Sequence, residues 1–479
     1  MIDKYVEKDI YRQIMISKLL FKNGTLNVND LVNHFKISRN TVVAYVSQIE
    51  ELISIDAATI KYEKGKITLV GKENVILFEL CQRIYSCSKW LKFVCSYLEG
   101  NTIEDIGNKN YLSLASCYRY KNLLDEYLVA IGKENVLSHH MNDENIYRML
   151  KTYLFFLTGV ELSFIDGSFY NRYSTNIYSF INRTCLKLQR KYSSESWEYI
   201  ELAVFIAIDE ITNKYPLKMP QRLKEDLTHF PILKIVKKSL RDNGLDTIID
   251  SEDEIVAITL LFIQLPYITT NMDVFELEFS RINNYYLENI PEYEDLINRF
   301  CIEFGEKNID TLIFYKSIIT YIDSMTLDYQ EFLPEQEEMF EEKDVVLKNR
   351  VSSVIKLWIQ ECLKEEFHIR DKCIDKLTNR ISFILNHKIQ YWVKIVASSD
   401  FEYQAIKDCI NSQECTCEFI IETETYYNLS EAIEKNISKN ELIVCTNDKF
   451  YCNEKKSINV NLKTLRKDII MGLQEYELI

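Results

Sequence analysis

The sequence predicts a mainly α-helical, multidomain protein that ends in a small α/β domain. Its 479 residues are enough for about three or four domains. Only 11 residues are glycine and 6 are proline, and this composition favours long helices joined by short polar connections. Apolar residues recur at helical spacing from about residue 145 to 385, whereas strand and helix patterns alternate after Trp392.

The first segment, residues 1–72, predicts a winged helix-turn-helix unit. Apolar residues at helical spacing mark helices over about residues 10–21, 26–35 and 38–52. Ser38 is a good N-cap for the third helix, and the short turn before it is typical of a helix-turn-helix. The alternating segment 60–69, which turns at Lys64-Gly65, predicts a β-hairpin and hence a wing.

A helix-turn-helix brings the N-terminal residues of its second helix to base edges in the major groove, because the first helix braces the second. Arg39 is suited to guanine and Asn40 to adenine. Hydroxyl groups such as those of Ser38 and Thr41 are suited to phosphates. The candidate DNA contacts of this segment are Ser38, Arg39, Asn40, Thr41, Tyr45, Gln48, Lys61, Lys64 and Lys66. The alternative is a three-helix module that binds protein and no DNA.

Charge is distributed unevenly along the chain. The whole chain has a net charge of −15, whereas residues 1–72 hold 11 Lys and Arg against 8 Asp and Glu. The overall acidity argues against a protein that coats nucleic acid over its whole surface. A slightly basic first segment on an acidic body instead suits a protein that touches DNA with one end.

The helix-turn-helix pattern returns in residues 73–140. A helix ends at Gly100, Thr102 caps a short helix, and a long helix begins near Leu112. The candidate DNA contacts here are Ser113, Ser116, Tyr118, Arg119 and Lys121. This segment holds 7 basic and 8 acidic residues, so a bracing domain without DNA contacts is the alternative.

Two stretches of the sequence carry a family resemblance. Residues 113–132 have the sequence SLASCYRYKNLLDEYLVAIG, and residues 143–148 have the sequence DENIYR. Both are similar to stretches of the Mga/AtxA family of virulence regulators from Gram-positive bacteria, the first to that family's second DNA-binding helix. Overall length and the order of the parts agree with this family along the whole chain.

The resemblance implies a domain order and a function. The expected domains are two winged helix-turn-helix units (1–72 and 73–140), two PRD-like helical bundles named after phosphotransferase-system regulation domains (141–280 and 281–388), and an enzyme IIB-like α/β domain (389–479). The implied function is transcription regulation, as an activator, by a homodimer that binds double-stranded promoter DNA. Further implied partners are RNA polymerase and a phosphocarrier protein of the sugar phosphotransferase system.

The resemblance also implies that histidines in the two bundles are phosphorylated. A phosphoryl group adds charge and strong hydrogen-bond acceptors, which can shift an interface. The second bundle holds His368 and His387, and the first holds His229 beside Pro231. A lone histidine is more often an ordinary surface or packed residue, so all three are candidates only.

The expected enzyme IIB-like domain lacks the group that its chemistry needs. A working enzyme IIB domain has a phosphorylated cysteine after its first strand, in a loop whose backbone N–H groups hold phosphate. Here that loop is Ser398-Ser399-Asp400, which has no cysteine, no glycine and a carboxylate that repels phosphate. We therefore expect a non-catalytic domain that serves as a dimerisation or docking surface.

Other function classes lack their sequence signals. No window reaches the roughly 20 apolar residues that span a bilayer, and the first residues lack an apolar signal region, so we expect a cytoplasmic protein with no membrane partner. The 13 cysteines show no paired zinc spacing, and we expect neither a metal nor a cofactor. Without a glycine-rich nucleotide loop or a nucleophile elbow, an enzyme is not expected. An RNA-binding antiterminator, whose head would be a small β domain, and a scaffold without DNA binding are the remaining alternatives.

Overall fold

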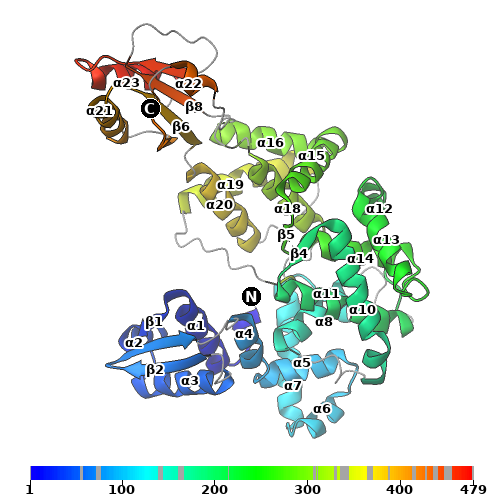
Figure 1. Ribbon diagram of the computed structural model, residues 1–479. Helices are drawn as coiled ribbons and strands as arrows, with labels where there is room; N and C mark the ends of the chain where they lie inside the picture. The colour runs from blue at the N-terminus through cyan, green and yellow to red at the C-terminus, as the bar shows by residue number, and fades with distance from the viewer. Residues whose placement is uncertain are drawn as a thin grey trace. The chain divides into compact units, whose positions relative to one another are not determined.

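The computed structural model is mainly helical, and its described residues form three small sheets (Figure 1). The structure describes residues 2–53, 58–71, 77–138, 144–159, 167–213, 215–305, 309, 311–327, 332–334, 345–363, 371–386, 389–412, 417–426, 429–434, 441–446 and 456–476. The predicted mainly-α class is confirmed at this level. Within the described residues, no helix is both long enough and apolar enough to cross a membrane.

The chain folds into two compact units. Unit 1 comprises Met1–Arg299, Tyr315–Lys343 and Ser352–Asp375. Unit 2 comprises Phe300–Phe314, Asp344–Val351 and Lys376–Ile479. The division into five domains is finer than this one and stays a prediction.

Unit 1 begins with three helices and a three-stranded antiparallel sheet. After the 3-10 turn η1 (Ile2–Lys4), the elements are α1 (Lys8–Asn23), β1 (Thr25–Asn27), α2 (Val28–Phe35), α3 (Arg39–Leu52), β2 (Ala58–Glu63) and β3 (Lys66–Gly71). Strand β3 lies between β1 and β2, so β1 fastens the β2–β3 hairpin to the segment between α1 and α2. The helices and the hairpin agree with the sequence prediction. Strand β1 was not predicted, because three residues are too few to show an alternating pattern.

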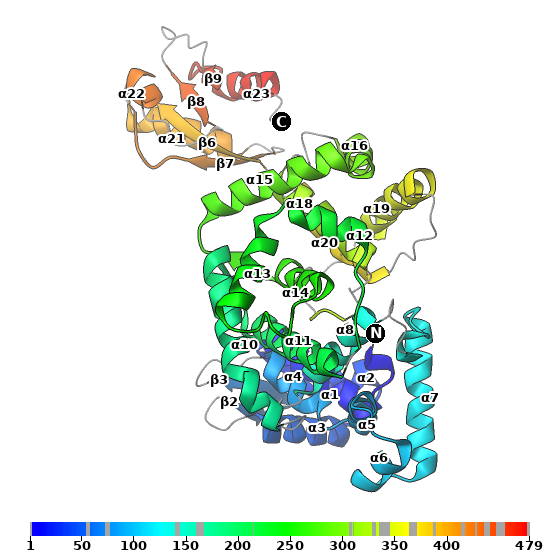
Figure 2. The ribbon, with the colours of Figure 1, turned by 90° about the vertical axis from the view of Figure 1, so that its right-hand side faces the viewer.

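Four helices follow in unit 1. They are α4 (Leu77–Tyr85), α5 (Lys89–Leu98), α6 (Ile103–Lys109) and α7 (Leu114–Ala130), followed by the 3-10 turn η2 (Val136–Ser138). Figure 2 shows α7 as a long helix with the short α6 at its lower end. Residues 77–138 contain no strand. The second wing implied by the family resemblance is therefore not found among these residues.

A helical bundle forms the remainder of the continuous part of unit 1. Its elements are α8 (Glu144–Thr158), α10 (Gly167–Leu188), β4 (Arg190–Tyr192), α11 (Ser194–Thr212), α12 (Gln221–Thr228), α13 (Pro231–Asp242), α14 (Glu252–Gln264), β5 (Tyr267–Thr269) and α15 (Met272–Asn289). Helix α11 is buried along most of its length and packs against α8, α10 and α14. The antiparallel pair β4–β5 was not predicted, because the periodicity indicated helices only.

Four further helices each contribute residues to both units. They are α16 (Pro291–Phe304), α18 (Leu312–Leu327), α19 (Val345–Trp358) and α20 (Asp371–Asn386). Helix α19 continues into the π-helical turn η3 (Ile359–Leu363). In unit 1, Arg299 on α16 donates to the carboxylate of Glu361 on this turn, 2.7 Å away.

Unit 2 contains an α/β fold with a four-stranded parallel sheet. Its elements are β6 (Ile389–Val396), α21 (Asp400–Asn411), β7 (Cys417–Ile421), α22 (Leu429–Glu434), β8 (Glu441–Cys445), β9 (Lys456–Asn459) and α23 (Leu465–Glu475). The strand order is β7-β6-β8-β9, and all three pairings are parallel. A parallel sheet needs helical crossovers on its faces, which explains the alternating sequence pattern after Trp392. The predicted alternation of strands and helices after Trp392 is present in the described residues.

Candidate nucleic-acid interface

Helices α2 and α3 and the turn between them form what we call the first frame. Lys36, the first residue of the turn, has a left-handed backbone with φ of 53°. Ile37 is half-buried against the core. Ser38 caps α3, because its Oγ accepts a hydrogen bond from the backbone N–H of Thr41 at 3.1 Å. The turn thus fixes where α3 begins and which residues its exposed end presents.

Helices α6 and α7 and their turn form a second frame that repeats the first, position by position. Tyr111 has a left-handed backbone with φ of 54°, as Lys36 has. Leu112 is half-buried as Ile37 is, and Ser113 caps α7 by accepting from the N–H of Ser116 at 3.2 Å. At the same offset along the chain, three further pairs of positions are buried in both frames: Leu31 and Ile106, Val42 and Cys117, and Ile49 and Leu124.

The exposed face at the start of α3 carries polar side chains. Arg39 and Asn40 are exposed in the first turn of the helix. One turn further, Val43 and Ala44 are exposed, and Ser47 follows them on the same face. Sequence reasoning missed these three residues, although their spacing of three, four and seven from Asn40 is the signal that identifies them.

Two of the residues chosen from the sequence lie on another side of α3. Tyr45 Oη accepts from Arg12 of α1 at 3.5 Å. The Gln48 side-chain oxygen accepts from Gln13 of α1 at 2.7 Å. The Tyr45 hydroxyl and the Gln48 side-chain oxygen therefore contact α1, and these two residues are not among the DNA contacts that we propose.

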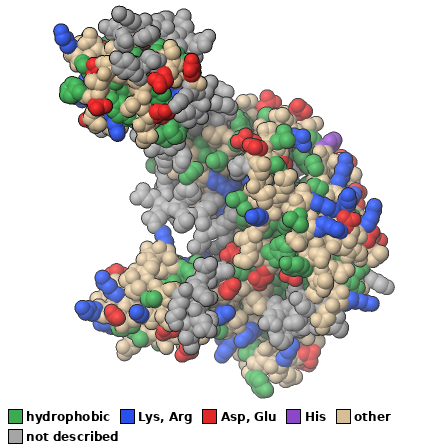
Figure 3. All heavy atoms as spheres, in the orientation of Figure 1, with side chains coloured by type: hydrophobic (Ala, Val, Ile, Leu, Met, Phe, Trp, Pro, Cys, Tyr) green, Lys and Arg blue, Asp and Glu red, His purple; other side chains and the backbone are tan. Residues whose placement is uncertain are grey.

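The hairpin β2–β3 lies next to the first turn of α3. The Nε and Nη2 atoms of Arg39 both donate to the hydroxyl of Tyr62 on β2, at 3.2 and 2.8 Å. The three lysines predicted for the wing are all exposed: Lys61, Lys64 and Lys66. Figure 3 shows lysine and arginine side chains at the outer end of this hairpin. Lys64 and Gly65 form the turn with φ of 49° and 79°.

The corresponding face of α7 is largely apolar. Leu114 is 51% exposed and Tyr118 is 58% exposed, and these two residues are one helical turn apart. Ala115 and Arg119 are exposed beside them. In the turn before the helix, Tyr111 is 97% exposed.

Two of the predicted contacts on α7 have partners within the second frame. Ser116 lies 2.9 Å from the capping hydroxyl of Ser113. Lys121 donates to Asp125 at 2.6 Å, and its ammonium lies over the ring of Tyr97. Of the five predicted residues, Ser113, Tyr118 and Arg119 are exposed.

The segment before α1 ties the two frames together within unit 1. The carboxylate of Glu7 accepts three hydrogen bonds at the start of α5: from the N–H groups of Lys89 and Trp90 at 3.0 and 3.1 Å, and from the Ser88 hydroxyl at 2.6 Å. The ring of Tyr5 stacks on Trp90 with 6.0 Å between ring centroids. A carboxylate at a helix N-terminus is stabilised by the free N–H groups there.

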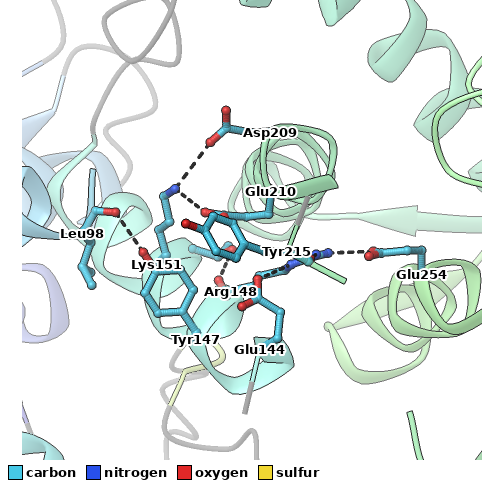
Figure 4. A network of polar contacts seen from close by, with 10 residues as sticks. Leu98, Glu144, Tyr147, Arg148, Lys151, Asp209, Glu210, Tyr215 and Glu254 are labelled. Atoms are coloured by element: carbon cyan, nitrogen blue, oxygen red, sulfur yellow. Dashed lines mark hydrogen bonds and ion pairs between the residues drawn. The ribbon is translucent and has the colours of Figure 1, made fainter. Parts of the chain in front are cut away.

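A buried polar network joins α8 to α5, α11 and α14 (Figure 4). Tyr147 on α8 donates to the backbone oxygen of Leu98 on α5 at 3.0 Å. On the next residue of α8, the Arg148 guanidinium donates to Glu144 at 3.0 Å, to Glu254 at 2.7 Å and to the backbone oxygen of Tyr215 at 2.6 Å. Burial raises the pKa of Glu254, although the neighbouring Arg148 lowers it.

A second ion pair extends this network. Lys151 donates to Glu210 on α11 at 2.6 Å and lies 3.5 Å from Asp209. Lys151, Glu210 and Arg148 are each about 5% exposed or less. Buried charges must be paired to be tolerated, so this network fixes how α8 sits against α11 and α14.

The structure describes one of the three histidines predicted as phosphorylation sites. His229 is exposed at the end of α12, with its ring centroid 5.0 Å from that of Tyr285. His368 and His387 lie outside the described residues. No group of three or more His, Cys, Asp and Glu side chains suited to a metal occurs in the part of the chain that the structure describes.

In unit 2, a carboxylate of the chain itself occupies the loop after β6. Glu402 accepts from the N–H and the hydroxyl of Ser398, at 2.9 and 2.7 Å, and from the Thr446 hydroxyl at 3.1 Å. These hydrogen bonds, chiefly that of the Ser398 hydroxyl, lower the pKa of Glu402. The two donors of Ser398 in this loop are thus already used by an internal anion.

Comparison with protein-family models and with curated proteins finds no match to this chain.

Proposed function

We propose that this protein is a DNA-binding transcription regulator that inserts α3 and α7 into the major groove. The single observation that carries the proposal is the repeated frame. Both copies have a left-handed turn residue, a half-buried apolar residue and a capping serine, and both leave the first turn of the second helix exposed. This is the arrangement that a helix-turn-helix uses to bring side chains to base edges.

Each part of the first frame has a role in this proposal. Asn40 reads adenine and Arg39 reads guanine, because their side chains match those bases bidentately. Lys61, Lys64 and Lys66 on the hairpin contact phosphates, which adds affinity without sequence information. The first frame with its hairpin is then a winged helix-turn-helix.

The second frame contacts DNA mainly through apolar groups. Leu114, Ala115 and Tyr118 suit the methyl group of thymine, which lies in the major groove, while Arg119 reaches guanine or phosphate. The alternative is that the second frame only braces the first. The pairing of Lys121 with Asp125 favours this alternative, because it removes one cation from the DNA-facing set.

The wider biological role rests on the family resemblance. We infer a cytoplasmic homodimer of the Mga/AtxA type that activates promoters. Its PRD-like bundles would receive phosphoryl groups from a phosphocarrier protein, and RNA polymerase would be the partner at the promoter. The loop at Glu402 supports a non-catalytic enzyme IIB-like domain, since the donors of Ser398 already bond to an internal carboxylate.

Selection from a randomised DNA duplex library tests the proposed function. Full-length protein is expected to enrich a sequence, and its affinity should fall steeply with salt because phosphate contacts release counterions. Double-stranded RNA of the enriched sequence is the control, since the deep, narrow major groove of RNA excludes helices. Failure to enrich any sequence, or equal affinity for the RNA, would contradict the proposal.

A further inference from the structure

The hydroxyl of Tyr62 holds the Arg39 guanidinium by one edge. Both hydrogen bonds to this hydroxyl come from neighbouring donors, Nε and Nη2, at 3.2 and 2.8 Å. A Cβ atom built on Gly65 would lie 3.6 Å from Nη2, so the guanidinium also rests against the hairpin turn. The first residue of α3 is therefore positioned by the hairpin and not by α3 alone.

The guanidinium is a planar fork with two edges that can each donate a pair of hydrogen bonds. Tyr62 takes the edge formed by Nε and Nη2. The outer edge is formed by Nη1 and the second hydrogen of Nη2, and among the described residues it has no hydrogen-bond partner. Two parallel donors on that edge match the O6 and N7 acceptors of guanine.

We propose that Tyr62 is a positioning residue that presents the outer edge of Arg39 to a guanine in the major groove. The inference rests on the proposed DNA-binding function and specifies the base that the first residue of α3 reads. A side chain already held in its bound position loses less conformational freedom on binding. The binding free energy gained in this way favours guanine at one position and does not raise the affinity for every sequence.

Two other roles for this contact make different predictions. If Tyr62 held Arg39 away from DNA, removal of its hydroxyl would strengthen binding. If the contact only fastened the hairpin to α3, removal of the hydroxyl would weaken binding to all sequences alike, because the hairpin lysines would no longer be held near the phosphates. Tyr62→Phe separates these cases, because it removes the hydroxyl and keeps the ring, which is 43% exposed.

The experiment compares full-length wild type, Tyr62→Phe, Arg39→Ala and the double variant. The probes are the duplex that wild type enriches from a randomised library, a scrambled duplex, and versions of the enriched duplex in which 7-deazaguanine replaces each guanine in turn. The modified base lacks the N7 acceptor and still pairs with cytosine. Tyr178→Phe, which removes the hydroxyl of an exposed tyrosine on α10, outside both frames, is the matched control.

We expect one guanine at which 7-deazaguanine weakens wild-type binding by about 10-fold, the scale of one bidentate base contact. Tyr62→Phe should bind the enriched duplex about 5-fold more weakly, bind the scrambled duplex with unchanged affinity, and lose most of its sensitivity to 7-deazaguanine. The double variant should be no weaker than Arg39→Ala, because the two residues act through one contact.

Three results would overturn the role of Tyr62 and leave the proposed DNA-binding function standing. The first is that Tyr62→Phe is as sensitive to 7-deazaguanine as the wild type is, and the second is that it binds DNA more tightly than the wild type. The third is that it binds the enriched and the scrambled duplex more weakly by the same factor. Wild-type protein that enriches no duplex would overturn the proposed DNA-binding function, and this inference with it. The two failures are therefore distinguishable.

Discussion

The two frames share one backbone arrangement but present different chemistry. In the first frame, the helix begins with Arg39 and Asn40, whose polar side chains are able to form hydrogen bonds. In the second, the equivalent positions hold Leu114 and Ala115, which offer only apolar contacts. This difference shows that the buried residues and the turn between the helices determine the backbone arrangement. The exposed residues in the first turn of the second helix can differ, and they determine what each frame contacts.

Support for the frames differs as well. The first frame has the hairpin beside it, and the hairpin holds Arg39. The second frame has no strand beside it in residues 77–138, and it rests on α5 and the buried network of α8. The polar surface of α3 thus has a second element, the β2–β3 hairpin, that orients the Arg39 side chain. An apolar surface needs less orientation, because contact with a methyl group is not directional.

The largest expected effect comes from breaking the buried polar network of α8, the helix that contacts α5 next to the second frame. Arg148→Ala leaves Glu144 and Glu254 buried without their partner, which should lower the free energy of unfolding by about 3–5 kcal/mol. Chemical denaturation measures this. Arg183→Ala, which removes an exposed partner of Asp242, is the control and should change stability by less than about 1 kcal/mol. Equal effects of the two variants would show that the buried network contributes no more to stability than an exposed ion pair.

Base reading by the first frame gives the next largest effect. Asn40→Ala should weaken binding to the enriched duplex by about 1–3 kcal/mol and relax the preference for adenine at one position. Gln48→Ala should leave base preference unchanged, because its oxygen is engaged by Gln13. Binding titrations on the enriched duplex and its single-base variants measure both. Loss of preference in Gln48→Ala but not in Asn40→Ala would reverse our assignment of the reading face.

The capping serines test whether the frames are structurally equivalent. Ser38→Ala and Ser113→Ala should each lower the free energy of unfolding by about 1 kcal/mol, because each removes the acceptor of an N–H group at a helix start. Thermal or chemical denaturation of the two variants provides the comparison. If one variant lowered the free energy of unfolding and the other did not, the two frames would not be structurally equivalent.

Apolar contact by the second frame gives the smallest effect. Leu114→Ala should weaken DNA binding by about 0.8 kcal/mol, the scale of one buried methylene group. Uracil in place of thymine removes the same methyl contact from the DNA side, so it should weaken the wild type and leave Leu114→Ala unchanged. Binding titrations with substituted duplexes test this. If uracil weakens both proteins equally, the methyl group is read elsewhere.

Much of the architecture could be predicted from the sequence, because it depends on local patterns. Helical spacing, Ser38 and Thr102 as caps, and the Lys64-Gly65 turn all act over a few residues. The pairing of β4 with β5 and the ion pairs of Arg148 join residues far apart in the chain, so no local pattern shows them.

The candidate site was harder to predict than the fold. Tyr45 and Gln48 were chosen for their chemistry, and the structure places their polar groups against α1. Val43 and Leu114 were overlooked, because an apolar residue in a helix usually indicates core and both are exposed. Tyr62 was overlooked because its contact with Arg39 joins the hairpin to α3.

The most direct test of the account asks whether both frames contact one duplex. Gel shifts of wild type, Arg39→Ala, Arg119→Ala and the double variant on the enriched duplex, at two salt concentrations, measure this. We predict salt-sensitive binding that each single substitution weakens and that the double substitution abolishes at the higher salt concentration. Wild-type affinity retained in the double variant would contradict the account, because neither frame would then be reading DNA.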